Sequence, residues 1–425
     1  MINKLRSLLS GNRPDLYAIL DLGTVEAKAL VVLVDGEQAA IIGAGRQAHH
    51  SGAIVNGMLS DAKQAAEACE RALVQAESLT ETIVGDKLIA DRAIVGISGP
   101  MLKSVCLSLA IRRPRPQERI SESELQAIIR RAERLVLRQA RTAVAEEHGT
   151  ADIDVGLVDA CVLRVLVDGS IVNNVVGSTG TQVEVRLSNV FAPVAYLTAV
   201  GSVATALDLH PVAILSGVGA LVRTPYIVGH GDAIIVDVGG DCTDIALVRH
   251  GGIEALYTLP MGGVSFARRI GRTLGVPLAA AEEIKRSYAG GRLDATRTAE
   301  LGAALGEDIQ TWLDGLQALL QEMAGDEALP AHLFLGGGGA ALPDLVRAAR
   351  AHPWLRVLPF ARQPQITTIQ PRQLAVIADR THQTNNESFV VPVSLAAWAV
   401  ASARRATTSP QQRALQQVLH GMGLA

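Results

Sequence analysis

The sequence predicts an α/β protein made of two related lobes with a nucleotide-binding cleft between them. A strand that ends in a tight turn occurs twice, first with the turn DLGT at residues 21–24 and again with DVGG at residues 237–240. Each copy leads into a second apolar strand, at residues 29–34 and at residues 245–248. Because two such hairpins stand in the two halves of one chain, we expect duplicated lobes that face each other.

The chemistry of the repeated turn indicates phosphate binding. An aspartate that ends a buried strand, such as Asp21 or Asp237, can hold a divalent cation through water. The glycine that follows lets backbone N–H groups approach phosphate oxygens that a Cβ atom would keep away. One such turn is often an ordinary hairpin, but its repetition favours a phosphate site. A third glycine cluster, at 336–339, lies between an apolar run and a helix-like segment, where the backbone can pack flat against a purine base or a ribose.

The spacing of apolar residues predicts the elements of the first lobe in order. Gly43 and Gly45 follow a strand and resemble part of a dinucleotide fingerprint. No amphipathic helix follows them directly, so we predict a turn there, with a Rossmann site as the less favoured alternative. The elements predicted before the insert are strands 17–21, 28–34 and 38–44, a helix from Asp61 to Ser78 with Ser60 as its N-cap, and a strand at 93–98.

A long amphipathic helix is the main feature of an inserted subdomain that we predict from residue 93 to about residue 191. The helix begins at the sequence SESE, residues 121–124, which has the spacing of a capping box. Strands are predicted near 158–166 and 182–187. Residues 112–141 hold nine arginines and four glutamates, and we favour a solvated face over a patch for an anionic partner because aromatic residues are absent. The apolar face of the helix consists of Leu125, Ile128, Ile129, Ala132, Leu135 and Val136.

Four stretches of the chain resemble the FtsA cell-division family of the actin and seventy-kilodalton heat-shock superfamily. They are residues 41–57 with Asp61, residues 93–99, residues 237–246, and residues 259–263 with 281–285. The resemblance implies an actin-like fold, a duplicated ribonuclease H-like ATPase fold, with an SHS2-like subdomain inserted in the first lobe. The implied domains are an N-terminal leader (1–15), the start of the first lobe (16–92), the inserted subdomain (93–191), the return to the first lobe (192–230), the second lobe (231–406) with a small subdomain at about 253–328, and a C-terminal tail (407–425).

The resemblance also implies that the cleft binds ATP with Mg²⁺. Asp21 and Asp237 would organise the metal ion. Glu282 and Lys285 stand three residues apart and share a helix face, so the two side chains can reach one ligand, and the resemblance places them at the ribose and base. Without it they would be an ordinary surface ion pair. The other implied nucleotide-binding residues are Gly23, Thr24, Gly239, Gly240, Thr243, Gly262, Gly263, Gly336, Gly337 and Gly338.

Three departures from the family pattern predict slow or absent ATP hydrolysis, and no catalytic residue is assigned. Val25 and Glu26 stand where the family usually has a small hydroxyl residue and a lysine, and Asp241 and Cys242 replace a glycine-threonine pair. The added carboxylates would repel a triphosphate unless they point away or a cation intervenes. Residues 215–221 lack the acidic residue that is common there in the family, so no side chain is placed to orient a water molecule.

The resemblance further implies a cytoplasmic adaptor that polymerises with ATP, grips the C-terminal tail of FtsZ through its second-lobe subdomain, and attaches it to the inner face of the membrane. A C-terminal amphipathic helix makes this attachment in the family. The tail from 409 to 425 carries Arg413 as its nearby cation, so it would bind lipid weakly by itself. Residues 1–9 are a competing anchor, for which a disordered leader is the alternative. The apolar stripe of the tail consists of Leu415, Val418, Leu419 and Met422.

Composition limits the other classes of function. The chain has 425 residues, 48% of them hydrophobic, which is enough for two or three domains with cores. Its net charge of −3 argues against attraction of the whole molecule to nucleic acid or to an acidic membrane. The four cysteines form no CxxC pair, so no zinc site is expected. We find no run of about eighteen apolar residues and no signal peptide, and we expect a cytoplasmic protein or a peripheral one on the inner membrane face.

Two alternative functions remain open. The pilus-assembly protein PilM is an actin-like adaptor of the same superfamily, and a chain of that kind would capture a peptide near the inserted subdomain without a lipid-binding tail. A small-molecule kinase of the same fold is less favoured. It would need a catalytic aspartate in the cleft, and no segment offers one apart from the acids of the phosphate loops.

Overall fold

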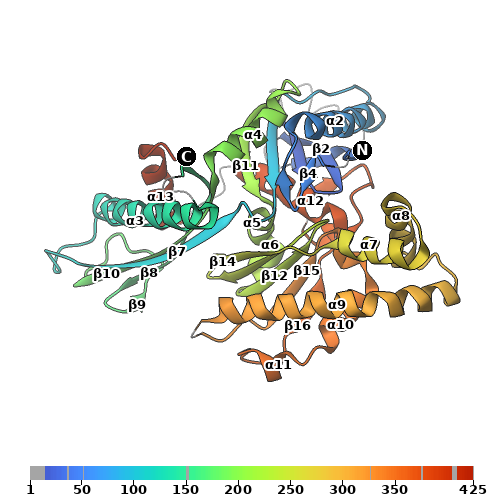
Figure 1. Cartoon of the computed structure of the whole chain (residues 1–425). Coiled ribbons are helices and arrows are strands. Elements are labelled where there is room, and N and C mark those ends of the chain that lie inside the picture. The colour runs from blue at the N-terminus through green and yellow to red at the C-terminus, as the bar shows by residue number, and fades with distance from the viewer. Residues whose placement is uncertain are drawn as a thin grey trace.

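The computed structural model shows two α/β lobes, one above the other in Figure 1, and a third unit that projects to one side. The predicted anchor at 1–9, and the predicted leader apart from Asp15, lie outside the residues that the structure describes. The described residues are 15–35, 38–50, 52–149, 153–325, 327–374, 377–403 and 409–424.

The two main sheets have the same strand topology. The first runs β3-β2-β1-β6-β11, with β17 added beside β3, and the second runs β14-β13-β12-β15-β16. In each sheet three antiparallel strands are followed by two parallel ones. This repeated order confirms the two related lobes that the sequence predicts. The strands of the first sheet are β1 (Asp15–Leu22), β2 (Glu26–Asp35), β3 (Gln38–Ala48), β6 (Arg92–Ile97), β11 (His210–Ser216) and β17 (Ala378–Asp379), and those of the second are β12 (Ala233–Val238), β13 (Thr243–Arg249), β14 (Gly252–Leu259), β15 (His332–Gly336) and β16 (Gln365–Thr368).

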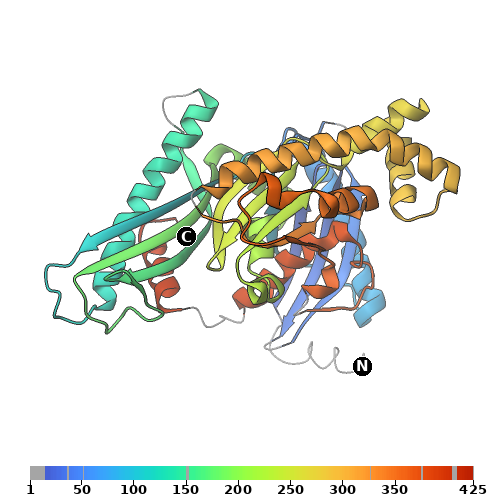
Figure 2. The same ribbon diagram turned by 90° about the horizontal axis from the view of Figure 1, so that it is seen from below.

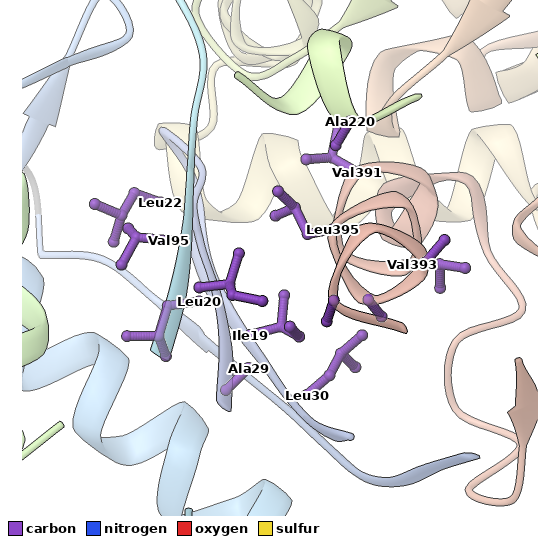
Figure 3. Close-up of a cluster of buried hydrophobic side chains, with 14 of the residues drawn as sticks. Ile19, Leu20, Leu22, Ala29, Leu30, Val95, Ala220, Val391, Val393 and Leu395 are labelled. Carbon is purple, nitrogen blue, oxygen red and sulfur yellow. The ribbon is translucent and has the colours of Figure 1, made fainter. Parts of the chain in front are cut away.

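Helices cover both faces of the first sheet, so β1 and β2 are nearly continuous apolar runs. Ile19 and Leu30 point towards Leu395 of helix α12 (Val390–Ala403), whereas Leu20 and Val95 point to the opposite side of the sheet (Figure 3). Helix α2 (Ala62–Val84) packs against β2 and β3. Its N-cap is Asp61, which accepts from two backbone N–H groups, and not the predicted Ser60.

Gly43 and Gly45 lie inside β3 and do not form the predicted turn. Their role is close packing against α2. A Cβ atom at Gly43 would stand 2.2 Å from the carbonyl oxygen of Ala76, and one at Gly45 would stand 2.0 Å from that of Ala72. Glycine is therefore needed here for helix-sheet contact, and the dinucleotide alternative has no support from the backbone.

The chain returns to the first lobe earlier than predicted. Strand β17 pairs with β3, and α12 packs against β1, β2 and β6. Residues 378–403 therefore lie with the first lobe, although the sequence assigned residues up to 406 to the second. The predicted small subdomain at 253–328 is also smaller, because β14 belongs to the main second sheet.

The insert begins at residue 103 and not at the predicted residue 93, because β6 belongs to the first sheet, and it ends at residue 193. It forms a separate sheet of order β7-β10-β8-β9 with one long helix, α3, against it (Figure 2). Ser121 caps α3 as predicted, by accepting from the N–H of Glu124 at 3.1 Å. The Glu124 carboxylate binds Arg113 at 2.7 Å and does not reach back to complete a capping box. The elements are β7 (Lys103–Arg112), α3 (Glu122–His148), β8 (Val155–Val167), β9 (Ser170–Ile171) and β10 (Gln182–Pro193).

The predicted C-terminal helix exists, but its apolar stripe is not free. Helix α13 (Pro410–Gly421) packs against α3 and β8. Leu415, Val418 and Leu419 are buried in the core of the insert, each at most 5% exposed. The expectation of a lipid-facing stripe is therefore corrected, because the apolar area is already removed from water.

The remaining elements complete the two lobes. In the described residues no helix is both long and apolar enough to cross a bilayer. These elements are β4 (Ile54–Val55), β5 (Met58–Leu59), α4 (Val194–Thr205), α5 (Gly217–Val222), α6 (Pro225–His230), α7 (Gly263–Leu274), α8 (Leu278–Ala289), α9 (Ala295–Ala324), the 3₁₀ turns η1 (Gly338–Ala341), η2 (Pro371–Gln373) and η3 (Glu387–Phe389), α10 (Pro343–Ala351) and α11 (Trp354–Val357).

Candidate functional site

A cavity of about 500 Å³ lies between the lobes and is lined by residues of both. The two repeated turns enter it from opposite sides, as the duplication predicts. Most of the predicted site residues meet here. They are Asp21, Gly23, Thr24, Asp237, Gly239, Gly240, Gly263, Glu282, Lys285, Gly337 and Gly338.

Three predicted residues, Thr243, Gly262 and Gly336, do not line the cavity. Thr243 is fully buried, where its hydroxyl donates to the carbonyl oxygen of Met261 at 2.7 Å and accepts from the indole N–H of Trp312 at 3.0 Å. Gly262 precedes α7, and Gly336 ends β15. These residues position the loops that line the cleft and do not face it.

Asp237 carries an unsatisfied carboxylate oxygen. Its Oδ1 atom is buried and has no hydrogen-bond partner. Burial raises the pKa of Asp237 to about 7, and the negative charges of Asp244 and Asp21 add to this effect. A buried carboxylate with a free oxygen is stabilised when it binds a cation or a proton.

A divalent cation fits beside Asp237, because it would satisfy the free oxygen and offset the clustered carboxylates. In the part of the chain that the structure describes, no group of three or more His, Cys, Asp or Glu side chains is placed to hold a metal. Asp21 and Asp237 would therefore hold Mg²⁺ only together with water or phosphate oxygens, which is usual for this ion.

Lys28 is a residue of the site that the sequence reading missed. Its ammonium group lies 3.2 Å from Oδ2 of Asp21 and 3.9 Å from Oε1 of Glu26. Burial opposes the charged form, but the carboxylates of Asp21, Glu26 and Asp237 raise the pKa of Lys28 above its usual value. The cleft thus contains a permanent positive charge beside the first turn.

Glu26, one of the added carboxylates, does face the cavity. Its charge is offset on both sides, by Lys28 and by Arg286 of α8, whose Nη2 lies 3.7 Å away. Arg286 comes from the opposite lobe, so this ion pair also joins the two walls of the cleft. The repulsion expected between Glu26 and a triphosphate is reduced accordingly.

Asp241, the other added carboxylate, is not among the residues that line the cavity. Its Oδ2 accepts from the backbone N–H of Asn56 in the first lobe at 2.9 Å. Asp244 makes a similar contact, since its Oδ2 accepts from the N–H of Gly99 at 2.8 Å. Two carboxylates of the second lobe are therefore hydrogen-bonded to the backbone of the first lobe.

The glycine cluster approaches the second turn closely. Gly337 has a φ of +81°, and a Cβ atom there would stand 2.3 Å from Oδ1 of Asp237. Only glycine meets both conditions. Gly337, Gly338 and Gly339 line the cavity, so their backbone offers a flat wall for a base or a ribose.

Glu282 and Lys285 of α8 form the ion pair that their spacing predicts, with Nζ of Lys285 2.9 Å from Oε1 of Glu282. The same ammonium donates to the carbonyl oxygen of Gly263 at 2.8 Å. Burial lowers the pKa of Lys285, while the Glu282 carboxylate opposes that shift. Both side chains line the cavity, so the pair is part of its wall and not an exposed surface pair.

A segment that consists mostly of the second lobe matches a known family. The family model "Cell division protein FtsA" matches residues 234–391. Cell division protein FtsA of Neisseria meningitidis serogroup B (strain ATCC BAA-335 / MC58) is 27% identical over 284 residues, which are 64% of this chain and 61% of that protein. The chain thus covers about three fifths of the length of this curated relative. These matches confirm the resemblance to the FtsA family.

Solved structures match nearly the whole chain. A chain of the PilM-PilN type IV pilus biogenesis complex superposes with a TM-score of 0.60 at 18% identity, over 90% of this chain and 97% of that one. The ethanolamine utilization protein EutJ from Carboxydothermus hydrogenoformans gives a TM-score of 0.49 at 14% identity, over 92% of this chain and 93% of that one. The first similarity shows the fold, which is the actin-like fold predicted from the sequence.

Proposed function

We propose that this chain is an ATP-binding, actin-like adaptor of cell division. It binds the C-terminal tail of FtsZ through helices α7–α9 of the second lobe, assembles with copies of itself, and holds FtsZ at the inner face of the cell membrane from the cytoplasm. ATP hydrolysis is slow or absent. The insert acts as the SHS2-like subdomain of the FtsA type.

The observation that supports this proposal most is that the segment matched by the FtsA family model supplies much of the wall of the cleft. Residues 234–391 include the second turn, the α7–α8 segment and the glycine cluster, all of which line the cavity. In the proposed complex, Asp21 and Asp237 hold Mg²⁺, and the backbone of Gly23 and Gly239 holds phosphates. Lys28 neutralises phosphate charge from the first lobe.

PilM is the second candidate, and two observations favour it. The PilM chain matches this one over most of its length, and α13 is packed against the insert, so a lipid-binding tail is not offered by this arrangement. On that reading the chain would capture a short peptide of an inner-membrane partner.

The test is co-sedimentation of the full chain with anionic liposomes and with FtsZ from the same cell, with and without Mg-ATP. We expect ATP-dependent recruitment of FtsZ to lipid. Asp237→Ala should abolish Mg-ATP binding and recruitment, as should Asp21→Ala, because each removes a carboxylate from the metal site. Asp232→Ala is the control, since Asp232 accepts from His250 within the second lobe.

Unchanged Mg-ATP affinity in either cleft variant would contradict the proposed site. Mg-ATP binding by the parent without FtsZ recruitment would favour the pilus-type adaptor. Release of ADP that depends on an added sugar would instead indicate the kinase.

A further inference from the structure

Helix α3 carries four exposed arginines, Arg130, Arg131, Arg134 and Arg138, which we call the arginine stripe. Arg134 follows Arg131 by three residues and Arg130 by four. Arg138 follows Arg134 by four, so the four arginines lie along one side of the helix over little more than two turns. None of the four has an ion-pair partner in the described part of the chain. Of the nine arginines of residues 112–141, Arg113, Arg115 and Arg141 are paired with carboxylates, and the four of the stripe are, among the described residues, the unpaired ones that lie on α3.

The acidic residues of α3 are engaged elsewhere or lie at its ends. Glu124 binds Arg113, and Glu147 binds Lys103 at 2.8 Å. Glu133 is fully buried on the opposite face, where it accepts from Asn189 at 2.8 Å. Glu122 stands in the first turn, and Glu146 lies near the last. Charge on this helix is therefore segregated and not mixed.

Segregation opposes helix stability. Arg130 with Arg134, and Arg134 with Arg138, are like charges four residues apart, an arrangement that destabilises a helix. A face that served only to keep the insert in solution would alternate charges, because that pattern adds attraction instead of repulsion. The stripe is thus better explained by an anionic partner than by solvation alone.

The neighbouring helix leaves the stripe positive. Helix α13 lies beside α3, with Gln126 donating to Gln417 at 2.6 Å. The sequence of α13 contains no aspartate or glutamate. No carboxylate of this helix can therefore neutralise the stripe.

We propose that the arginine stripe is the surface by which this chain lies against an anionic lipid bilayer. The inference rests on the proposed function, because it names the contact by which that adaptor meets the membrane. It also replaces the tail helix in that role, since the apolar stripe of α13 is buried in the insert.

Three properties of the stripe match a lipid surface. Guanidinium groups bind phosphate in a bidentate manner, and phosphatidylglycerol presents such phosphates across a plane. Helix α3 lies against one face of the sheet of the insert (Figure 2), and the four arginines of the stripe are exposed. Neither α3 nor α13 contains an aromatic residue, so the base stacking that favours single-stranded nucleic acid is missing.

Four arginines give a weak contact in a single molecule. Each basic residue near an anionic membrane strengthens binding about fivefold. Stable attachment would therefore depend on several copies binding side by side. The contact is electrostatic, so it weakens as ionic strength rises.

The test uses the full chain and vesicles of phosphatidylcholine, with and without phosphatidylglycerol. The double variant Arg131→Gln/Arg134→Gln should lower binding to the anionic vesicles about 25-fold, which is fivefold for each charge. The matched control is Arg356→Gln/Arg372→Gln, which removes two exposed arginines of α11 and η2 and should bind as the parent does. Unchanged thermal unfolding shows that the variants are folded.

Equal binding of the stripe variant and the parent would overturn the proposal, as would equal binding of the parent to neutral vesicles. If the parent ignores vesicles but binds polyglutamate through the stripe, the partner is an acidic protein and the proposal is wrong. A measurement of FtsZ binding in the absence of lipid tests the proposed function separately from the proposed membrane contact. A parent that binds anionic vesicles through the stripe but does not bind FtsZ would refute the proposed function and leave the stripe intact.

Discussion

The carboxylate of Asp241 illustrates how a residue that looks unfavourable in the sequence can have a different role in the fold. A second negative charge next to a phosphate turn should weaken nucleotide binding. In the structure it reaches across to the N–H of Asn56 instead. The residue therefore links the two lobes, and its carboxylate is directed to Asn56 and does not line the cavity.

We predict that Asp241→Ala accelerates nucleotide release about tenfold, because a hydrogen bond to a charged group contributes about 1.5 kcal/mol. Stopped-flow release of a fluorescent ATP analogue measures this rate. Asp232→Ala is the control, since it removes a hydrogen bond of the same length, 2.9 Å, that stays within one lobe. Tighter binding by the Asp241 variant would show that the carboxylate points into the cleft after all.

The position of a site residue could be predicted from the sequence where a strand determines the direction of its side chain. Asp21 and Asp237 each end a buried strand, and both face the cleft. Lys28 was missed because we expected the lysine within the turn, whereas it lies on the returning strand directly opposite Asp21. Counting the register of the hairpin would have found it. The direction of Asp241 could not be predicted, since its partner belongs to the other lobe.

Helix α3 contains a buried acid that should make the insert sensitive to pH. Burial raises the pKa of Glu133 to about 7, and the hydrogen bond from Asn189 opposes the shift. Because the folded state raises the pKa of Glu133, folding favours the protonated form of this side chain. The contribution of Glu133 to the free energy of unfolding is therefore complete at a pH below the pKa that Glu133 has in the unfolded chain. That contribution is lost as pH rises through about 7.

We therefore predict that Glu133→Gln stabilises the insert at pH 8 relative to the parent, by up to about 3 kcal/mol, and by little at pH 4. Urea unfolding followed by circular dichroism at the two pH values measures the difference. Glu146→Gln on the exposed face of the same helix should change nothing at either pH. A gain that is the same at both pH values would mean that ionisation of Glu133 is not the cause.

At the level of elements, periodicity predicted that a face is buried but not what buries it. The predicted apolar face of α3 does pack against the sheet of the insert. The stripe of α13 has the same kind of pattern, and we assigned it to lipid because nothing local distinguishes a membrane from a neighbouring helix. Glu124 shows the same limit, because its spacing fits a capping box while Arg113, eleven positions earlier, takes its carboxylate.

In the whole molecule, the insert is covalently continuous with the first lobe and also makes ion pairs and hydrogen bonds with the second. Arg186 of β10 lies 2.6 Å from Glu254 of β14, and both side chains are 17% exposed. The N–H of Leu256 donates to the hydroxyl of Ser104 at 2.8 Å. Strand β14 also supplies Thr258, which donates to Asp244 at 2.6 Å. The insert is thus connected to the wall of the cleft through one strand.

We predict a coupling energy of about 1–3 kcal/mol between Arg186→Ala and Glu254→Ala in a double-mutant cycle, because the two charges are close and largely buried. Thermal unfolding of the four proteins gives the value. Arg297 and Glu300 form an exposed pair at 2.8 Å and should couple by less than about 0.5 kcal/mol. Equal coupling in the two pairs would show that the Arg186–Glu254 pair adds no more stability than an exposed ion pair does.

The duplicated architecture was predictable at this scale because the same turn occurs in both halves, and the topology of the two sheets agrees. The limits of the lobes were not. Residues 378–403 return to the first lobe because β3 and the open face of the first sheet need partners, and only the assembled sheet reveals that need.

The two ends of the insert lie close together, which has a consequence for the evolution of such proteins. Lys103 at its start and Phe191 near its end are paired neighbours on adjacent antiparallel strands. Paired residues of this kind lie only about 5 Å apart, so a two-residue hairpin could close the gap. The segment between them can therefore be gained, lost or exchanged by recombination as a module together with α13, whose apolar stripe it buries, while the path of the chain through the two lobes stays the same.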